Sequence, residues 1–347
     1  MNRTTYAIDI AKRVMQLHWV DAPTGEIKRR RLTREKLVPF FAELQPVRIV
    51  MEACGGAHHW ARCLSSLGHQ VELLPPRQIR AFVRSDKDDA ADARAIWLAS
   101  QHSDIRRVPI KSCEQQAVLS LHRTREHWKD VRTATINCLR GLLYEFGVVL
   151  PRGRQAALKT LAERRADIDN VLPALMSPMV DAQLAMLDHV DHCMKQLQTQ
   201  IAATSGKTAQ RLRQVNGIGL LGASALAATL GDASGWRSGR EFSASLGLVP
   251  KHSGTGGKTR IGHLSKRGDS YLRTLFMHGA RSAILHMKTK PRWLEQLLLR
   301  RPSTWSWWPW PTKWPASPGR WLPTDAATTP VGQAPRPSLP PRSIETV

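Results

Sequence analysis

The stretch TTYAIDIAKRVMQLHWV, residues Thr4–Val20, decides the fold of the N-terminal region. Its first part, Thr4–Ile10, is an apolar run typical of a buried strand, and its last part, Val14–Val20, alternates as a half-buried strand does. Asp9 lies inside the first run, where a lone carboxylate is costly to desolvate unless it is paired or bound to a metal. We therefore predict two strands here and a site that includes Asp9.

The residues that follow continue an α/β pattern to about residue 110. A turn leads into a third alternating run, and two further apolar runs alternate with segments of helical spacing. The predicted elements are strands Glu26–Leu32, Arg48–Met51 and Gln70–Leu74 and helices Arg34–Leu44, Ala57–Leu67 and Ile79–Ser100. Three strands, helix, strand, helix, strand, helix is the order of a ribonuclease-H-like domain, which we predict for residues 1–110.

The rest of the chain is predicted to be mostly helical, so the fold class is α/β plus α. Residues 111–206 are expected to form a helical arm or coiled coil, with helices over Ser112–Phe146 and Asp167–Ala203. Residues 207–300 form a second globular unit, in which a Gly- and Lys-rich loop, Pro250–Lys266, precedes a helix over Asp269–Met287. Residues 301–347 are rich in Pro and Trp without periodicity, and we expect this tail to be disordered.

Charge is the most unusual property of the composition. The 347 residues contain 51 Lys and Arg against 28 Asp and Glu, a formal net charge of +23, which indicates a polyanionic partner such as nucleic acid. Residues 302–347 have only two more basic than acidic residues, so +21 of this charge belongs to residues 1–301. No apolar run reaches about 18 residues and there is no signal peptide, so we expect no membrane partner. Five scattered cysteines without a CxxC pair fit a reducing cytoplasm.

Asp9 has a predicted partner on the next strand of the sheet. Glu52 follows the strand Arg48–Met51 directly, and that strand neighbours Thr4–Ile10 in the predicted fold, so the two carboxylates can converge. An Asp or Glu at a strand end is also commonly a solvated cap.

Asp89 and Asp92 lie three residues apart on one face at the start of a predicted helix. They could be simple N-terminal charges favoured by the helix dipole, and Asp86 or Asp88 could supply a ligand in their place. Together with Asp9 and Glu52 they make four carboxylates, which can hold two divalent ions. Such ions activate a nucleophile and stabilise the leaving oxygen in phosphoryl transfer.

The second globular unit carries candidate DNA contacts. The turn of Gly217 and Gly219 lies between two helical stretches, where backbone N–H groups can approach a phosphate as in helix-hairpin-helix proteins, although a plain tight turn has the same pattern. Basic residues that could offset phosphate charge follow it. They are Lys258, Lys266, Arg267 and Arg273.

Several motifs resemble one known family. These are AIDIAK at residues 7–12, MEACGGAHHW at 51–60, DDAADA at 88–93, GLVPKHSGTGGK at 247–258, LSKRGD at 264–269 and YLR at 271–273. They resemble the DEDD transposases of insertion-sequence family 110, subgroup 1111, over about the first 300 residues.

The resemblance implies a RuvC-like N-terminal domain whose four acidic residues are Asp9, Glu52, Asp89 and Asp92, and Mg²⁺-dependent DNA strand exchange. It also implies an element-encoded guide RNA, double-stranded DNA as substrate, a homo-oligomer (dimer or tetramer) and a location on the bacterial nucleoid.

The resemblance further implies a serine nucleophile that becomes covalently linked to DNA, just before the Gly-Gly pair. A hydroxyl on a flexible loop near cations suits attack on a phosphodiester. The family's usual serine lies one residue nearer the Gly-Gly than Ser253 does in this chain. Thr255 is therefore a competing hydroxyl and Ser265 a more distant one, and we favour Ser253.

Two other functions are compatible with the same residues. A RuvC-like structure-specific endonuclease would need the carboxylates but not the serine, and an inactive copy would bind nucleic acid without cutting it.

In the tail, a shift of one base would turn the Trp/Pro tract after Trp307 into an amphipathic helix, so we hypothesise a frameshift near residue 302. The alternative is a genuine Pro/Trp-rich interaction segment.

Overall fold

The computed structural model describes residues 4–83, 88–230, 236 and 238–300. The expectations about Asp86 and about the tail 301–347 fall outside these residues. Among the helices that are described, none combines the length and the apolar character needed to cross a bilayer.

The N-terminal region is a five-stranded mixed sheet, as predicted. Its strands are β1 (Thr5–Ile10), β2 (Val14–Val20), β3 (Ile27–Thr33), β4 (Arg48–Glu52) and β5 (Gln70–Leu74). Their order is β3-β2-β1-β4-β5, with antiparallel pairing among the first three and parallel pairing of β1 with β4 and of β4 with β5. This order makes β1 and β4 neighbours at the centre of the sheet.

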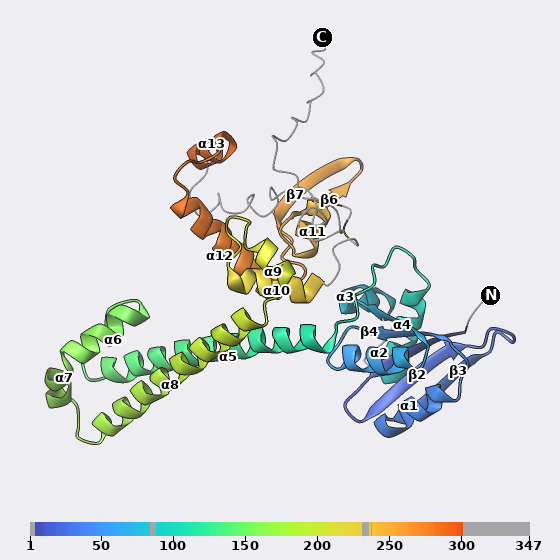
Figure 1. Ribbon diagram of the computed structural model, residues 1–347, viewed down its shortest axis with the longest axis horizontal. Coiled ribbons are helices and arrows are strands. Elements are labelled where there is room, and N and C mark those ends of the chain that lie inside the picture. Colours follow the sequence, from blue (N-terminus) through green and yellow to red (C-terminus); the bar gives the residue numbers. More distant parts are fainter. Residues whose placement is uncertain (1–3, 84–87, 231–235, 237, 301–347) are drawn as a thin grey trace, which may run out of the picture.

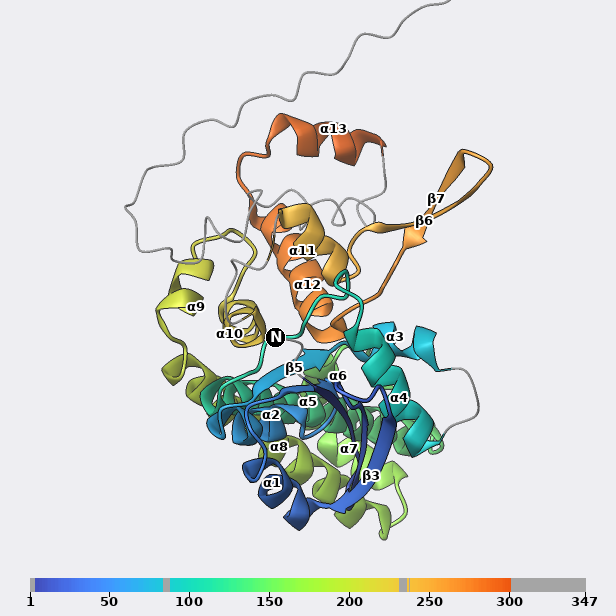
Figure 2. The same ribbon diagram turned by 90° about the vertical axis from the view of Figure 1, so that its right-hand side faces the viewer.

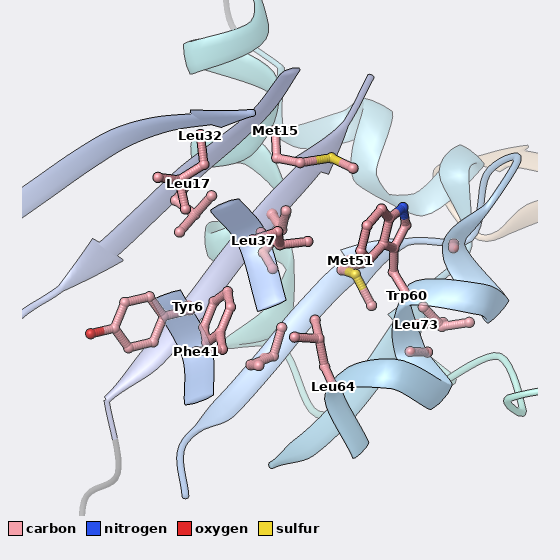
Figure 3. Close-up of a cluster of buried hydrophobic side chains, with 14 residues drawn as sticks. Tyr6, Met15, Leu17, Leu32, Leu37, Phe41, Met51, Trp60, Leu64 and Leu73 are labelled. Atoms are coloured by element: carbon pink, nitrogen blue, oxygen red, sulfur yellow. The ribbon is translucent and has the colours of Figure 1, made fainter. Parts of the chain in front are cut away.

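Helices cover both faces of this sheet. Helices α1 (Arg34–Ala42) and α2 (Ala57–Ser66) pack on one face, where Ile8 and Met51 join a large apolar core (Figure 3). Helix α4 (Asp89–Ser100) packs on the opposite face against Ala7 and Val50. Alternate residues of β1 therefore face different helices, as the two-residue period of a strand requires.

The helix predicted over Ile79–Ser100 is interrupted. The structure has a short α3 (Pro76–Ile79) and a 3₁₀ turn, η1 (Arg80–Phe82), before α4 starts at Asp89. Val83 and Asp88 both have extended backbone, which ends the first segment and caps the second. The prediction of one continuous helix was wrong.

A long arm extends from the sheet region (Figure 1). Helix α5 (Cys113–Tyr144), which begins with a Ser112–Gln115 capping box, runs outward, and α8 (Met176–Ala203) returns along it, with α6 (Arg154–Glu163) and α7 (Arg165–Val171) at the far end. The helix predicted over Asp167–Ala203 is thus divided into α7 and α8. Leu172 has extended backbone because it precedes Pro173, which disfavours the helical conformation.

The C-terminal part is mainly helical with one small sheet. Its elements are α9 (Lys207–Leu212), α10 (Leu220–Leu230), α11 (Gly239–Ser245), β6 (Pro250–Thr255), β7 (Lys258–Leu264), α12 (Ser270–His286) and α13 (Arg292–Arg300). A buried apolar cluster that includes Leu226, Leu248 and Phe276 holds α10 and α12 together. The helix predicted over Asp269–Met287 is confirmed as α12, which Asp269 caps through a bond from the Leu272 N–H.

Candidate functional site

Asp9 and Glu52 lie at the ends of neighbouring parallel strands and share one face of the sheet. The register pairs Ala7 with Val50 and Ile8 with Met51, so the next position along the two strands pairs Asp9 with Glu52. Ala7 and Val50 pack beneath α4, and side chains two residues further along a strand return to the same face. Both carboxylates therefore belong to the face that α4 covers.

Helix α4 brings the two aspartates to this face at its first turn. It starts at Asp89, its N-cap is Asp88, and Asp92 lies one turn further along. The helix lies against β1 and β2 and is fixed there by buried Ala95, Ile96 and Ala99. The four predicted acidic residues thus come from three separate elements around the ends of β1 and β4.

Asp9 lies within electrostatic range of the other three carboxylates. Burial raises the pKa of Asp9 to about 6, with further increases from the charges of Asp92, Asp89 and Glu52. Burial and the charge of Asp92 likewise raise the pKa of Glu52. The backbone N–H of Ile10 is the opposing influence on Asp9. Among the described residues, every side chain that shifts the pKa of Asp9 is a carboxylate.

This group of acids fits a divalent cation in its chemistry. Carboxylate oxygens are hard ligands of the kind that Mg²⁺ and Mn²⁺ prefer, and a cation would offset the mutual repulsion. However, within the described ranges no three acidic, His or Cys side chains lie close enough together to bind one ion. The other three carboxylates are within electrostatic range of Asp9, and the role of all four as one ligand set stays a prediction.

Cys54 is a neighbour of this site that the sequence analysis did not single out. Burial raises the pKa of its thiol, and the charges of Glu52 and Asp9 raise it further. Its position two residues after Glu52 was the available signal. Asp88, weighed above as an alternative ligand, is exposed at the N-cap of α4.

The serine segment is a β-hairpin and not the loop that was predicted. Strands β6 and β7 pair antiparallel, with Thr255 opposite Lys258, so Gly256 and Gly257 form the two-residue connection. Both glycines have positive φ, +56° and +77°. This is the requirement of a type I′ turn, whose twist matches that of the strands it joins.

The hairpin places the three candidate hydroxyls differently. Ser253 and Thr255 both lie on β6 and are exposed, and because they are two residues apart they share a face. Ser265 follows β7, and its hydroxyl oxygen is buried without a hydrogen-bond partner in the described structure. A substrate therefore reaches Ser253 and Thr255 more readily than Ser265.

The predicted nucleic-acid contacts differ in their freedom to bind. Lys258, Lys266 and Arg267 are exposed. Arg273 is half-buried and donates from Nη1 to the carbonyl oxygen of Leu246 at 2.9 Å, which gives it a structural partner at the end of α11.

In the turn between α9 and α10, close packing against α12 requires a glycine at one of the two glycine positions. Gly217 has φ +90°, and a Cβ there would lie 2.9 Å from the carbonyl oxygen of Gly279 on α12. Gly219 is exposed and a Cβ there would meet nothing. Of the two predicted phosphate contacts, Gly219 is the one that faces open space.

Comparisons with known proteins agree with both halves of this arrangement. A family model described as "Transposase", for the DEDD domain of insertion-sequence family 110, matches residues 6–147. A second, described as "Transposase IS116/IS110/IS902 family", matches residues 209–296.

Individual proteins match over most of the chain. A "Probable family 20 transposase" of Pseudomonas aeruginosa is 45% identical over 310 residues, 87% of this chain and 92% of that protein. The transposase for insertion sequence element IS1328 of Yersinia enterocolitica is 36% identical, covering 81% of this chain and 84% of the relative. The corresponding protein of element IS1111A of Coxiella burnetii is 35% identical, covering 85% and 82%. With two family models along its length and relatives of this similarity, the chain belongs to the IS110 family of DEDD insertion-sequence transposases.

Proposed function

We propose that this transposase cuts and rejoins double-stranded DNA with two separate sets of groups, a metal-binding carboxylate site and a serine nucleophile. The carboxylates are Asp9, Glu52, Asp89 and Asp92. The observation that carries this proposal is that burial and the other three carboxylates together raise the pKa of Asp9. Mg²⁺, bound as one or two ions, would supply Lewis-acid stabilisation of the phosphoryl oxygens.

The residues of the chain have distinct tasks around such ions. Asp9 and Glu52 lie on neighbouring, hydrogen-bonded strands, which would hold these two ligands in fixed positions. Asp89 and Asp92 lie on the first turn of α4. Since Asp9 must lose its proton to bind a cation, ion binding is expected to weaken as the pH falls towards the pKa of Asp9.

Ser253 is the proposed nucleophile, and the hairpin gives a reason for its position. A side chain at residue 254, where the usual spacing would put the serine, would bring a Cβ to 2.7 Å from the carbonyl oxygen of Lys258. Gly254 avoids that contact, and the hydroxyl group lies at residue 253. Thr255 shares the face of Ser253 and is the alternative that the experiment must exclude.

The test is a strand-exchange reaction with the element's own DNA ends in Mg²⁺. Asp9→Asn should abolish cleavage while leaving DNA binding largely intact. Stalled reactions should contain protein bound covalently to DNA, with the adduct mapped to Ser253. An adduct on Thr255 would reassign the nucleophile, and cleavage retained in Ser253→Ala would favour a RuvC-like endonuclease that uses the carboxylates alone.

A guide RNA and a homo-oligomer, a dimer or tetramer, complete the proposal. Both are supported by the family resemblance, and the net charge of +23 suits an RNA as well as a DNA partner. Dependence of strand exchange on the element's noncoding RNA, and the mass of the active complex in solution, are the corresponding measurements. An inactive copy would bind these partners without forming product.

A further inference from the structure

The β6–β7 hairpin is a cationic ribbon with both faces open to solvent. Residues 251–263 are all exposed, and the hairpin projects from the helices around it (Figure 2). It contains Lys251, Lys258 and Arg260, and the segment 250–264 has no acidic residue that could neutralise them. A two-stranded hairpin whose residues 251–263 are all exposed is marginally stable by itself, so this ribbon is suited to being stabilised by a polyanion.

The turn fixes which side chains share a face of the ribbon. The register pairs Ser253 with Arg260 and Thr255 with Lys258. Residues directly opposite in an antiparallel pair point to the same side, with Cβ atoms about 4.5–5.5 Å apart. Arg260 is therefore the cationic residue directly across the ladder from the proposed nucleophile. Its neighbour Thr259 points to the other side, because successive residues of a strand alternate.

The geometry points to Arg260 as the residue that binds the scissile phosphodiester beside Ser253 and stabilises its transition state. This inference rests on the proposed role of Ser253 as the nucleophile. A planar guanidinium can donate two parallel hydrogen bonds to the non-bridging oxygens of a phosphate, which orients the phosphorus towards the hydroxyl. Lys258, opposite Thr255 and next to the turn, is a point charge further from Ser253.

The reaction is a transesterification, and the role of Arg260 follows from its charge balance. The Ser253 Oγ–P bond forms and the bond from phosphorus to one deoxyribose oxygen breaks. The serine proton passes to solvent and the leaving oxygen takes up a proton, so a diester is exchanged for a diester. Negative charge on the non-bridging oxygens increases in the transition state, and a guanidinium held across the ladder offsets it.

The experiment compares full-length variants that differ in where the guanidinium lies. Arg260→Ala removes it and Arg260→Lys keeps the charge without the planar fork. The double change Thr259→Arg with Arg260→Thr moves it to the opposite face at constant composition. Each is tested with duplexes of the element's ends that carry either a phosphodiester or an uncharged methylphosphonate at the scissile position. The readouts are DNA affinity and the rate of covalent adduct formation.

For the phosphodiester, Arg260→Ala should slow adduct formation by about 10²–10³-fold, the usual effect of removing one oxyanion-stabilising donor. The face-swapped variant should lose as much, with affinity within about threefold of the parent in both. With the methylphosphonate, Arg260→Ala should change the rate by less than about threefold, because the charge that Arg260 binds is absent. With the phosphodiester, the rate of adduct formation by Arg260→Lys should lie between those of the parent and of Arg260→Ala.

Four results would overturn this assignment. Equal losses on both substrates would mean that Arg260 acts through the fold of the hairpin. Full activity of the face-swapped variant would mean that only the net charge of the ribbon matters. If Ser253→Ala loses the adduct and Arg260→Ala keeps it, the inference about Arg260 fails while the proposed nucleophile stands. An adduct that persists in Ser253→Ala overturns the proposed nucleophile, and the role of Arg260 with it.

Discussion

The Nδ1 atom of His122 lies 2.8 Å from the phenolic oxygen of Tyr271, and this hydrogen bond joins the arm to the C-terminal helices. His122 is on α5 and Tyr271 is on the first turn of α12. The other ring nitrogen of His122 lies 3.3 Å from the hydroxyl of Ser224 on α10. Burial lowers the pKa of His122 to about 4 and raises that of Tyr271 to about 12, so both groups are neutral near pH 7.

Replacing Tyr271 by Phe should destabilise the protein measurably. The change would leave a buried nitrogen of His122 without its partner, which costs about 1–3 kcal/mol. Urea unfolding, followed by circular dichroism, measures the loss. Tyr144→Phe is the matched control, since Tyr144 is 66% exposed at the end of α5 and its hydroxyl should contribute less than about 0.5 kcal/mol. Equal effects of the two changes would contradict a structural role for the His122–Tyr271 bond.

Three histidines should make the folded protein sensitive to acid. Burial, as the largest cause, lowers the pKa values of His18, His58 and His122 from 6.5 to about 4. Between these values the unfolded chain binds more protons than the folded one, so stability is fully present above pH 6.5 and decreases as the pH falls to about 4. Urea midpoints measured from about pH 7 to about pH 4.5 should fall, and His122→Gln should flatten that dependence. A slope unchanged in His122→Gln would argue against this contribution.

The sheet was predictable from the sequence because its signals are local. The alternation of Val14–Val20 and the run Gln70–Leu74, which Pro75 ends, gave the bounds of β2 and β5 to the residue. The predicted order of the strands makes Asp9 and Glu52 neighbours, and the parallel pairing of β1 with β4 agrees with this. What the sequence did not show is where α4 starts, and this start sets how far Asp89 and Asp92 lie from the two strands.

The hairpin was missed for the opposite reason. Since residues 251–263 bury no face, they have no apolar alternation, and only the Gly256–Gly257 pair marks the turn. The position of Arg260 opposite Ser253 follows from the register of the two strands. A segment predicted to be a loop has no register, so this pairing could not be predicted. A two-glycine connection between β-compatible residues was the signal that could have found it.

When no metal is bound, the ionised side chain of Asp9 should make the folded protein less stable than a neutral side chain at the same position would. The raised pKa of Asp9 means that its ionised form is disfavoured in the folded state, so its contribution is lost as the pH rises through about 6. Asp9→Asn should therefore raise stability at about pH 8 by about 1 kcal/mol, a value discounted for partial exposure, and so raise Tm by about 2–4 °C in chelator.

In Mg²⁺ the parent protein should instead have a higher Tm than Asp9→Asn, because the ion stabilises only the chain with a complete ligand set. Thermal unfolding with chelator and with Mg²⁺ measures both effects, and Asp104→Asn, at an exposed position, is the control. If Mg²⁺ raised the Tm of Asp9→Asn as much as that of the parent protein, Asp9 would not be a ligand.

Nucleic-acid binding should weaken steeply with salt. The +21 charge of residues 1–301 and the exposed Lys258, Lys266 and Arg267 allow several phosphate contacts, each of which releases a counter-ion. With six or more contacts, affinity should fall by about 10³-fold or more between about 50 and about 200 mM salt. Arg267→Ala should reduce the slope of log affinity against log salt by about one, uniformly across sequences. A nearly flat salt dependence would refute the electrostatic account of binding.

The two glycines of the hairpin turn should be separable by substitution. Gly256→Asn should keep strand-exchange activity, because Asn tolerates positive φ and Asn-Gly is a preferred type I′ pair. Gly257→Val should lose it, since a β-branched residue is strained at φ +77° and the turn would have to change. A changed turn shifts the register, and a shift of one residue moves Ser253 away from Arg260 and onto the opposite face. Adduct formation is the measurement, with DNA affinity as the control for folding, and equal activity of the two variants would show that the register of the hairpin does not position the serine.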